Sequence, residues 1–274
     1  MDDKLPTGAW AIDDEMRVQL RLKHIYKLLN GGASGAAILE IEELLDEQPD
    51  HMEGLFLLGE ACLDAGNIEI AKLAYERHVA LTNGRDPLSL LGLGVSNLEL
   101  CALPEALEHI REACRLAPDL ADAHYHLGLT LNYLGMGEQA QTSFETARAI
   151  EPTAFPPPLE LSESDWEEAI QEALSRVQED IRTFWSGVPV HLHALPKITL
   201  LKSTSPPTSP NIAGMYIGSP PEDDEPQNYR PEALELYVSN LALCRTRAEL
   251  VEQIGLTLHT EALNWLGLPP LNRG

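Results

Sequence analysis

Three histidines are the side chains whose types and spacing come nearest to a catalytic metal site. His191 and His193 are separated by one residue, so a β-strand would place both imidazoles on one face, and His259 lies on a later segment. Imidazole is a common zinc ligand, and zinc held by three protein ligands activates water for hydrolysis. These residues define one candidate function, metal-assisted hydrolysis at a non-standard site.

Other familiar catalytic patterns are absent from the sequence. There is no G-x-S-x-G, P-loop or dinucleotide-binding fingerprint. The four cysteines lack C-x-x-C spacing, which argues against a zinc knuckle and fits a reducing compartment: Cys62, Cys101, Cys114 and Cys244. We therefore expect no cofactor and no metal.

The composition restricts the partners that the chain can bind. Acidic residues outnumber basic ones by 43 to 19, and the formal net charge is −24. Such a surface repels phosphate groups, so nucleic acid and anionic membranes are poor candidates. No apolar run approaches the ~20 residues that span a bilayer, and the acidic N-terminus does not resemble a signal peptide. We expect a cytoplasmic protein; its acidity suits either a basic partner or simple solubility.

A repeat of about 34 residues organises the first half of the chain. Small residues recur at matching positions, namely Ala37, Ala71, Ala106 and Ala140. Twelve residues before the last three alanines comes a Leu-Gly pair that ends at Gly59, Gly94 or Gly128. Twelve residues after the first, third and fourth comes a proline, at Pro49, Pro118 and Pro152. The pattern predicts paired antiparallel helices that stack unit on unit.

This pattern resembles the tetratricopeptide repeat. The resemblance implies an α-solenoid of about four helical hairpins over residues 18–154, with a weaker first unit where His24 and Ile25 replace Leu-Gly. It also implies a groove lined by the first helix of each unit. The residues expected there are Phe56, Glu60, Leu91, Val95, Tyr125, Leu129, Asn132 and Tyr133. Apolar side chains with acidic margins favour a segment that carries Leu or aromatic anchors with Lys or Arg. The groove could equally pack against the chain's own second domain.

The second half of the chain predicts a smaller α+β domain. Residues 1–17 form an acidic N-terminal segment, and a proline-rich linker at 155–164 follows the repeats. Residues 165–274 then predict one amphipathic helix at 165–185, with Ser164 as its N-cap and Glu167 completing a capping box. Two strands follow within 188–201, and then a strand or turn at 212–220. The segment 233–242 begins as a strand, and a closing helix follows at 247–266.

The order of these elements resembles a small bacterial zincin-like metallopeptidase family. The similarity depends on a G-x-Y-x-G-x-P element from Gly214 to Pro220, a P-x-x-L-x-x-Y strand from Pro231 to Tyr237, and the closing helix. In that family the closing helix carries H-E-x-x-H-x-x-G-x-x-D, whereas here the run is T-E-A-L-N-W-L-G-L-P-P. The resemblance places Thr260, Asn264 and Pro270 at the ligand positions, while Glu261 and Gly267 remain. It implies a degenerate motif without catalytic residues, because zinc is needed to lower the pKa of water.

The two resemblances together predict a non-enzymatic protein that works by binding other proteins. The most specific expectation is a pseudoenzyme in a heteromeric complex, an inhibitor or stabilising partner of an active protease. Two alternatives stay open. One is the metallopeptidase with a site at His191, His193 and His259, and the other is a simple repeat adaptor whose second domain only caps the array.

Overall fold

A computed structural model describes residues 14–219 and 229–268. The chain divides into two compact units, Met1–Leu127 and Gly128–Gly274, and each is described here by itself. The division falls inside one helix, so the proline-rich residues 155–162 lie within the second unit. No helix of the described residues has both the length and the apolar character to cross a membrane.

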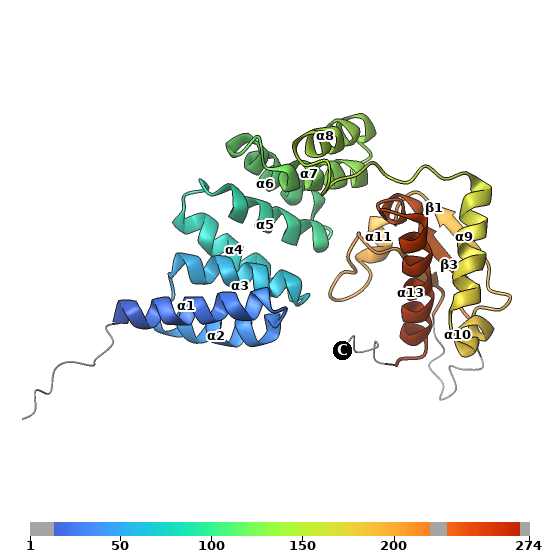
Figure 1. Cartoon of the computed structure of the whole chain (residues 1–274), viewed down its shortest axis with the longest axis horizontal. Coiled ribbons are helices and arrows are strands. Elements are labelled where there is room, and N and C mark those ends of the chain that lie inside the picture. The colour runs from blue at the N-terminus through green and yellow to red at the C-terminus, as the bar shows by residue number, and fades with distance from the viewer. Residues whose placement is uncertain (1–13, 220–228, 269–274) are drawn as a thin grey trace, which may run out of the picture. The chain divides into compact units, whose positions relative to one another are not determined.

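The first unit is built from antiparallel helical hairpins (Figure 1). The first two hairpins are α1 (Asp14–Asn30) with α2 (Ser34–Glu47) and α3 (Met52–Asp64) with α4 (Ile68–Leu81). The third is α5 (Pro87–Glu99) with α6 (Leu103–Leu116), and α7 (Ala121–Tyr133) begins in this unit. Each helix also packs on the next one along the chain, from α1 to α6. The helical solenoid that the repeat predicted is therefore confirmed.

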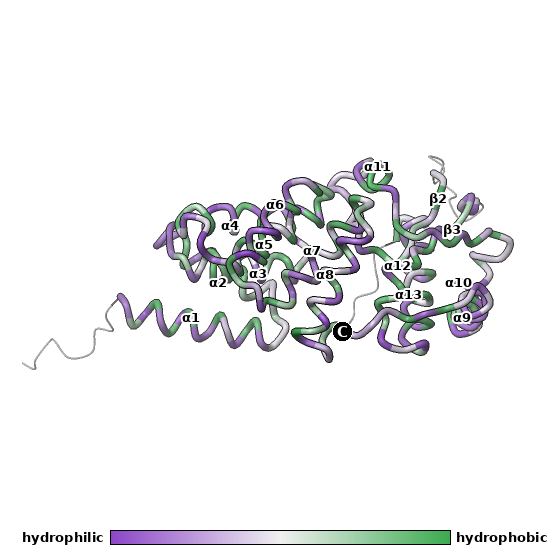
Figure 2. Tube along the Cα trace, turned by 90° about the horizontal axis from the view of Figure 1, so that it is seen from above, coloured by the Kyte–Doolittle hydropathy of each residue, from purple (hydrophilic) through white to green (hydrophobic). Residues whose placement is uncertain are grey.

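The residues of the repeat pattern explain why these helices form and approach closely. Figure 2 shows hydrophilic and hydrophobic residues alternating along α1, as expected for a helix that buries one face, here Leu22 and Ile25. Helix α5 begins at Pro87, where proline is tolerated, and the Asp86 side chain accepts a hydrogen bond from Ser89 N–H. The alanines at 37, 71 and 106 are fully buried, and any larger side chain there would separate the helices.

The second unit contains the rest of α7 and the remaining helices and strands. Its helices are α8 (Gly137–Ile150), α9 (Glu163–Arg176), α10 (Glu179–Phe184), α11 (Ile198–Leu201), α12 (Val238–Leu241) and α13 (Arg247–Trp265). Its strands are β1 (Val190–His193), β2 (Gly214–Ile217) and β3 (Ala233–Tyr237), in the order β1-β3-β2. Strand β1 is parallel to β3, with Val190 opposite Leu234, and β2 is antiparallel to it, with Tyr216 opposite Leu234.

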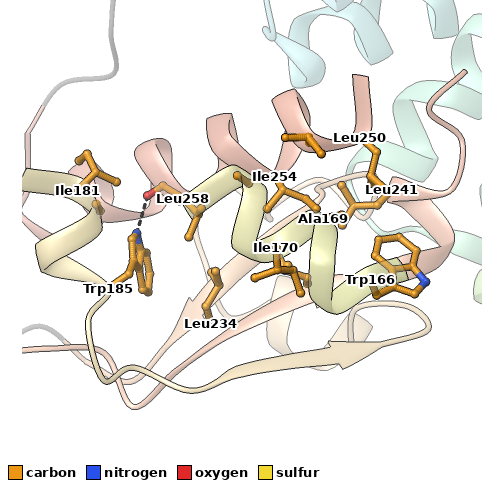
Figure 3. Packing of buried hydrophobic residues seen from close by; sticks show 14 of the residues in the cluster. Trp166, Ala169, Ile170, Ile181, Trp185, Leu234, Leu241, Leu250, Ile254 and Leu258 are labelled. Atoms are coloured by element: carbon orange, nitrogen blue, oxygen red, sulfur yellow. Dashed lines mark hydrogen bonds between the residues drawn. The ribbon is translucent and has the colours of Figure 1, made fainter. Parts of the chain in front are cut away.

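The core of the second unit lies between the sheet and the helices α9 and α13. Figure 3 shows Ala169 and Ile170 of α9 facing Ile254 and Leu258 of α13, with Leu234 of β3 below. The indole N–H of Trp185 donates a hydrogen bond of 2.8 Å to the carbonyl oxygen of Leu258. The small α+β architecture expected for this half is present, with a few short strands.

Three details of the second unit differ from the prediction. The single helix expected at 165–185 is two helices, because the chain is extended at Val177 and Gln178. The N-cap of α9 is Ser162, whose capping box uses Asp165, so Glu163 and Ser164 belong to the helix and not to the linker. The run around Ile198, expected as a strand, forms the short helix α11.

Candidate functional site

The first helices of the hairpins present one continuous set of side chains in the first unit. We call this set the odd-helix face and define it by Tyr26 of α1, by Glu53, Phe56, Glu60 and Asp64 of α3, and by Leu88, Leu91 and Val95 of α5. Four of these residues were predicted to line the groove: Phe56, Glu60, Leu91 and Val95. The two on α3 lie one turn apart, and so do the two on α5.

One tyrosine from a second helix reaches this face through a gap made by glycines. A Cβ atom at Gly59 of α3 would lie 2.5 Å from the ring of Tyr75, and one at Gly92 of α5 would lie 2.3 Å from it. Neither distance is possible for real atoms, so the ring of Tyr75 fits only because both positions are glycine. The Tyr75 hydroxyl then donates a hydrogen bond to the carboxylate of Glu60. Burial, reinforced by Glu60, raises the pKa of Tyr75, so the phenol remains a donor.

Phe56 is held in place by two aromatic side chains of α4. Its ring centroid lies 6.1 Å from that of Tyr75 in an edge-on arrangement and 5.9 Å from the ring of His78. Such contacts fix a half-buried aromatic ring before any partner arrives. The sequence pattern predicts Phe56 and Glu60 for the groove but not Tyr75 as their support. The additional glycine at Gly92 is the signal in the sequence that a large ring must fit there.

A buried Ser-His-Asp group lies between the second and third hairpins. The Oγ atom of Ser89 is 2.6 Å from Nδ1 of His78 and also donates to the carboxylate of Asp86. In a hydrolase the histidine stands between the other two residues, whereas here the serine occupies the middle and is fully buried. Burial lowers the pKa of His78, with Asp86 opposing the shift. The arrangement joins two repeats and does not create a nucleophile.

The remaining predicted groove residues lie on α7. Tyr125 is half-buried in the first unit, and its ring meets His126 edge-on at 5.5 Å. Leu129 is buried and Asn132 half-buried in the second unit. Tyr133 is engaged by its own chain, because its hydroxyl lies 2.6 Å from the carbonyl oxygen of Pro210 and 2.9 Å from Oδ1 of Asn240. These contacts join the end of α7 to Pro210 and Asn240 of the same unit.

The degenerate motif lies on the C-terminal half of α13. Thr260 and Asn264 are exposed one turn apart, and Gly267 ends the helix with a φ of 64°, a conformation that favours glycine. Glu261 between them points to the sheet and not to solvent. Its Oε2 accepts a hydrogen bond of 3.0 Å from the backbone N–H of Tyr216 in β2, and its Oε1 accepts one of 3.0 Å from Asn264. Pro270 lies outside the described residues.

Both carboxylate oxygens of Glu261 therefore accept hydrogen bonds from groups of the same chain. Burial raises the pKa of this carboxyl group, while the hydrogen bonds from Tyr216 and Asn264 act in the opposite direction. Tyr216 in turn packs edge-on against Trp265 at 5.3 Å. The group thus fastens α13 to the edge strand β2, a long-range contact that the sequence alone did not reveal.

The three histidines of the alternative metal site do not gather into one cluster within the described residues. His191 and His193 lie on β1 with ring centroids 6.4 Å apart, and Nε2 of His193 is 3.4 Å from Glu235. His259 instead lines a cavity of about 800 Å³ with Arg176, Thr246 and Thr260. Within residues 14–219 and 229–268 no three His, Cys, Asp or Glu side chains gather in a way that could hold a metal ion. The residues on which the metallopeptidase alternative depends are not brought together.

Comparison with known proteins agrees with the helical part of this description. Residues 22–86 and 63–121 match the tetratricopeptide repeat family model. Comparison with curated protein sequences gave no match.

Several solved structures resemble about half of the chain. One is the crystal structure of MamA, at 24% identity over 52% of this chain and 77% of that chain, with a TM-score of 0.43. Another is TTC0263, described as a thermophilic TPR protein in Thermus thermophilus, at 27% identity over 49% and 75%, with a TM-score of 0.45. A fragment of MamA from Desulfovibrio magneticus is 21% identical over 48% and 75%, also with a TM-score of 0.45. Taken with the hairpins, buried alanines and close glycine contacts, the family match identifies the N-terminal helices as a tetratricopeptide repeat array.

Proposed function

We propose that this chain is a non-catalytic scaffold that binds another protein on the odd-helix face of its repeats. The observation that carries the proposal is the apolar stripe on α5, where Leu88 is 48% exposed beside the half-buried Leu91 and Val95. Residues at i, i+3 and i+7 lie on one side of a helix and can meet one partner together. The preformed Phe56 ring extends this stripe onto α3.

The second domain is proposed to have a zincin-like frame that no longer performs chemistry. Thr and Asn offer only neutral oxygens at the two positions where that family has histidines, and neither imidazole nor thiolate replaces them there. The glutamate that would polarise a zinc-bound water is Glu261, and its two oxygens hold β2 and Asn264 instead. A domain of this kind retains surfaces for recognition without the means to cleave a peptide bond.

The specific role that fits both halves is partner or inhibitor of an active protease in a heteromeric complex. A peptidase-like domain joined to a binding array can bind a protease or the substrate of a protease without cleaving a peptide bond. This part of the proposal is supported by the resemblance of residues 165–270 to the zincin-like family.

The test is co-purification with a matched pair of variants of the tagged full chain. Leu88→Asp introduces a charge on the odd-helix face, whereas Leu73→Asp introduces the same charge at a leucine of α4 that is 63% exposed. We expect a stoichiometric protein partner with the wild type and Leu73→Asp and its loss with Leu88→Asp, with both variants folded by circular dichroism. A partner retained equally by all three proteins would contradict the proposed face, and a chain that stays alone would contradict the scaffold role.

Catalysis is tested separately on the purified chain. We expect less than stoichiometric zinc by elemental analysis and no cleavage of unfolded casein. Cleavage that disappears in Glu261→Gln, or in His193→Ala, would replace the scaffold proposal with an enzymatic function.

A further inference from the structure

We infer that the partner segment recognised by the odd-helix face is a basic amphipathic helix, with apolar anchors on one side and Lys or Arg beside them. The inference rests on the proposed function and adds the chemical class of the partner. It depends on the charges of α3 and α5, on the way two carboxylates of α3 are held, and on the apolar stripe of the neighbouring α5.

The two central helices of this face contain no basic residue. Helix α3 reads MEGLFLLGEACLD and helix α5 reads PLSLLGLGVSNLE, so together they carry four carboxylates and neither Lys nor Arg. On α3 the carboxylates stand at Glu53, Glu60 and Asp64, all exposed. Helix α1 does carry basic residues, at Arg17, Arg21, Lys23 and Lys27. Of these, Arg21 pairs with Glu43 and Glu47 of α2. Helices α3 and α5 themselves therefore contribute only negative charge to the odd-helix face.

Tyrosine hydroxyls hold two of these carboxylates in position. Tyr26 of α1 donates a hydrogen bond of 2.9 Å to Glu53, and Tyr75 donates one to Glu60. A carboxylate has about four acceptor sites, so each glutamate keeps sites for an ammonium or guanidinium group. Because the tyrosine already orders the side chain, less entropy is lost when a cation binds. Asp64, one turn beyond Glu60, supplies a further negative charge.

The apolar residues lie where the anchors of such a helix would be buried. Leu88, Leu91 and Val95 follow one side of α5, and Phe56 lies on the neighbouring α3, backed by Tyr75 and His78. A helix that lays its apolar side on this stripe would bring its flanking side chains over the α3 carboxylates. A segment with Glu or Asp at those flanks would meet like charges and be repelled.

The experiment measures binding of designed helices to the full chain by fluorescence anisotropy. The first probe is a fluorescein-labelled helix of about 20 residues, or roughly five turns, with Leu on one side and Lys on its flanks. The second replaces every Lys with Glu and keeps the Leu side. We expect the Lys helix to bind, with an affinity that falls as salt increases because the charges are exposed, and the Glu helix not to bind. Equal binding of both helices, or binding of neither, would overturn the inference.

Variants locate the effect on the odd-helix face. The double variant Glu60→Gln, Asp64→Asn keeps an acceptor for Tyr75 while removing two charges. It should weaken binding of the Lys helix by about 2- to 30-fold, the effect of two exposed ion pairs. The control Glu105→Gln, Glu108→Gln removes two exposed charges from α6 and should leave binding unchanged. Equal weakening by both double variants would show a non-specific charge effect and sink the proposal.

The outcome is distinguishable from failure of the proposed function. Suppose that the native partner is lost with Leu88→Asp but is retained by the double variant Glu60→Gln, Asp64→Asn at both normal and raised salt. The odd-helix face then binds a protein without recognising basic side chains. In that case the scaffold role stands and only the present inference fails.

Discussion

Two glutamates show how differently the two halves of this chain use a carboxylate. Glu60 on α3 accepts a hydrogen bond from Tyr75 and stays exposed, whereas Glu261 on α13 has both oxygens bonded within the fold and its pKa raised by burial. The Glu60 carboxylate is positioned by the protein and is still accessible to a partner. The Glu261 carboxylate instead forms hydrogen bonds that hold helix α13 on strand β2. The presence of a carboxylate is thus no sign of function until its burial and its hydrogen-bond partners are known.

The sharpest way to break this comparison is to close the gap that lets Tyr75 reach Glu60. Gly92→Ala places a Cβ 2.3 Å from the Tyr75 ring, so the ring or α5 must move. We expect the free energy of unfolding to fall by about 2–3 kcal/mol, as for other overpacked cores, measured by guanidinium denaturation.

The control for this substitution is Gly35→Ala in α2. No atom lies within 4 Å of a Cβ there, and alanine favours a helix over glycine by up to about 1 kcal/mol. Its stability should be unchanged or raised. A Gly92→Ala protein as stable as the wild type would mean that the glycines do not create the passage for Tyr75.

The next largest effect is expected at Glu261. Glu261→Ala leaves the Tyr216 N–H of the edge strand without its acceptor, which costs about 1–3 kcal/mol, while Glu261→Gln keeps an acceptor oxygen and should cost less. Hydrogen exchange of the Tyr216 amide checks the mechanism, since it should quicken in the alanine variant alone. Unchanged exchange in both variants would rule out the fastening role.

The pH dependence of stability provides a test at Glu261 with a smaller expected effect. Because burial raises the folded-state pKa of Glu261, the native state binds a proton more readily than the unfolded chain. The carboxyl group's contribution is therefore fully present below the ordinary glutamate pKa and is lost as the pH rises through the raised value. The stability of the wild type relative to Glu261→Gln should decline over that window. A difference that is flat, or that grows with pH, would contradict the shift.

The smallest effect is expected for the matching substitution on the other carboxylate. Glu60→Gln should change the free energy of unfolding by no more than about 0.5 kcal/mol, because the side chain is exposed and glutamine still accepts from Tyr75. Thermal denaturation of the two Glu→Gln proteins side by side measures the contrast. A large loss at Glu60 would place that residue in the same structural class as Glu261.

The sequence predicts the repeat half of the fold well because its signals are local and recurrent. The alanine at position 71, the glycine at 59 and the tyrosine at 75 have equivalents about 34 residues further along the chain. The close contact of the glycine with the large side chain recurs at Gly94 with Ile110 and at Gly128 with Phe144. The closing helix, expected at 247–266 and observed at 247–265, was predictable because apolar residues recur at helical spacing along its whole length.

The rest depends on contacts that no local pattern contains. The Glu261–Tyr216 bond joins residues 45 positions apart, and the Tyr133–Asn240 bond joins residues 107 apart. The four residues of α11 are too few to distinguish helix from strand by periodicity. Several Ser and acidic residues lie close together at the start of α9, and each could cap the helix. Only the backbone geometry shows that Ser162 is the N-cap and that Asp165 completes the capping box. The odd-helix face was predicted as a list of positions, but its support by Tyr75 required the three-dimensional packing.

The ring of Tyr75 is shared between two repeats, and this limits how the array can change. Gly59 belongs to the repeat that contains Tyr75, whereas Gly92 belongs to the next one. Exchanging the α5–α6 hairpin for one with a larger residue at the position of Gly92 would set a side chain against that ring. These two hairpins therefore form one packing module of four helices, and an engineered exchange has to keep both glycines.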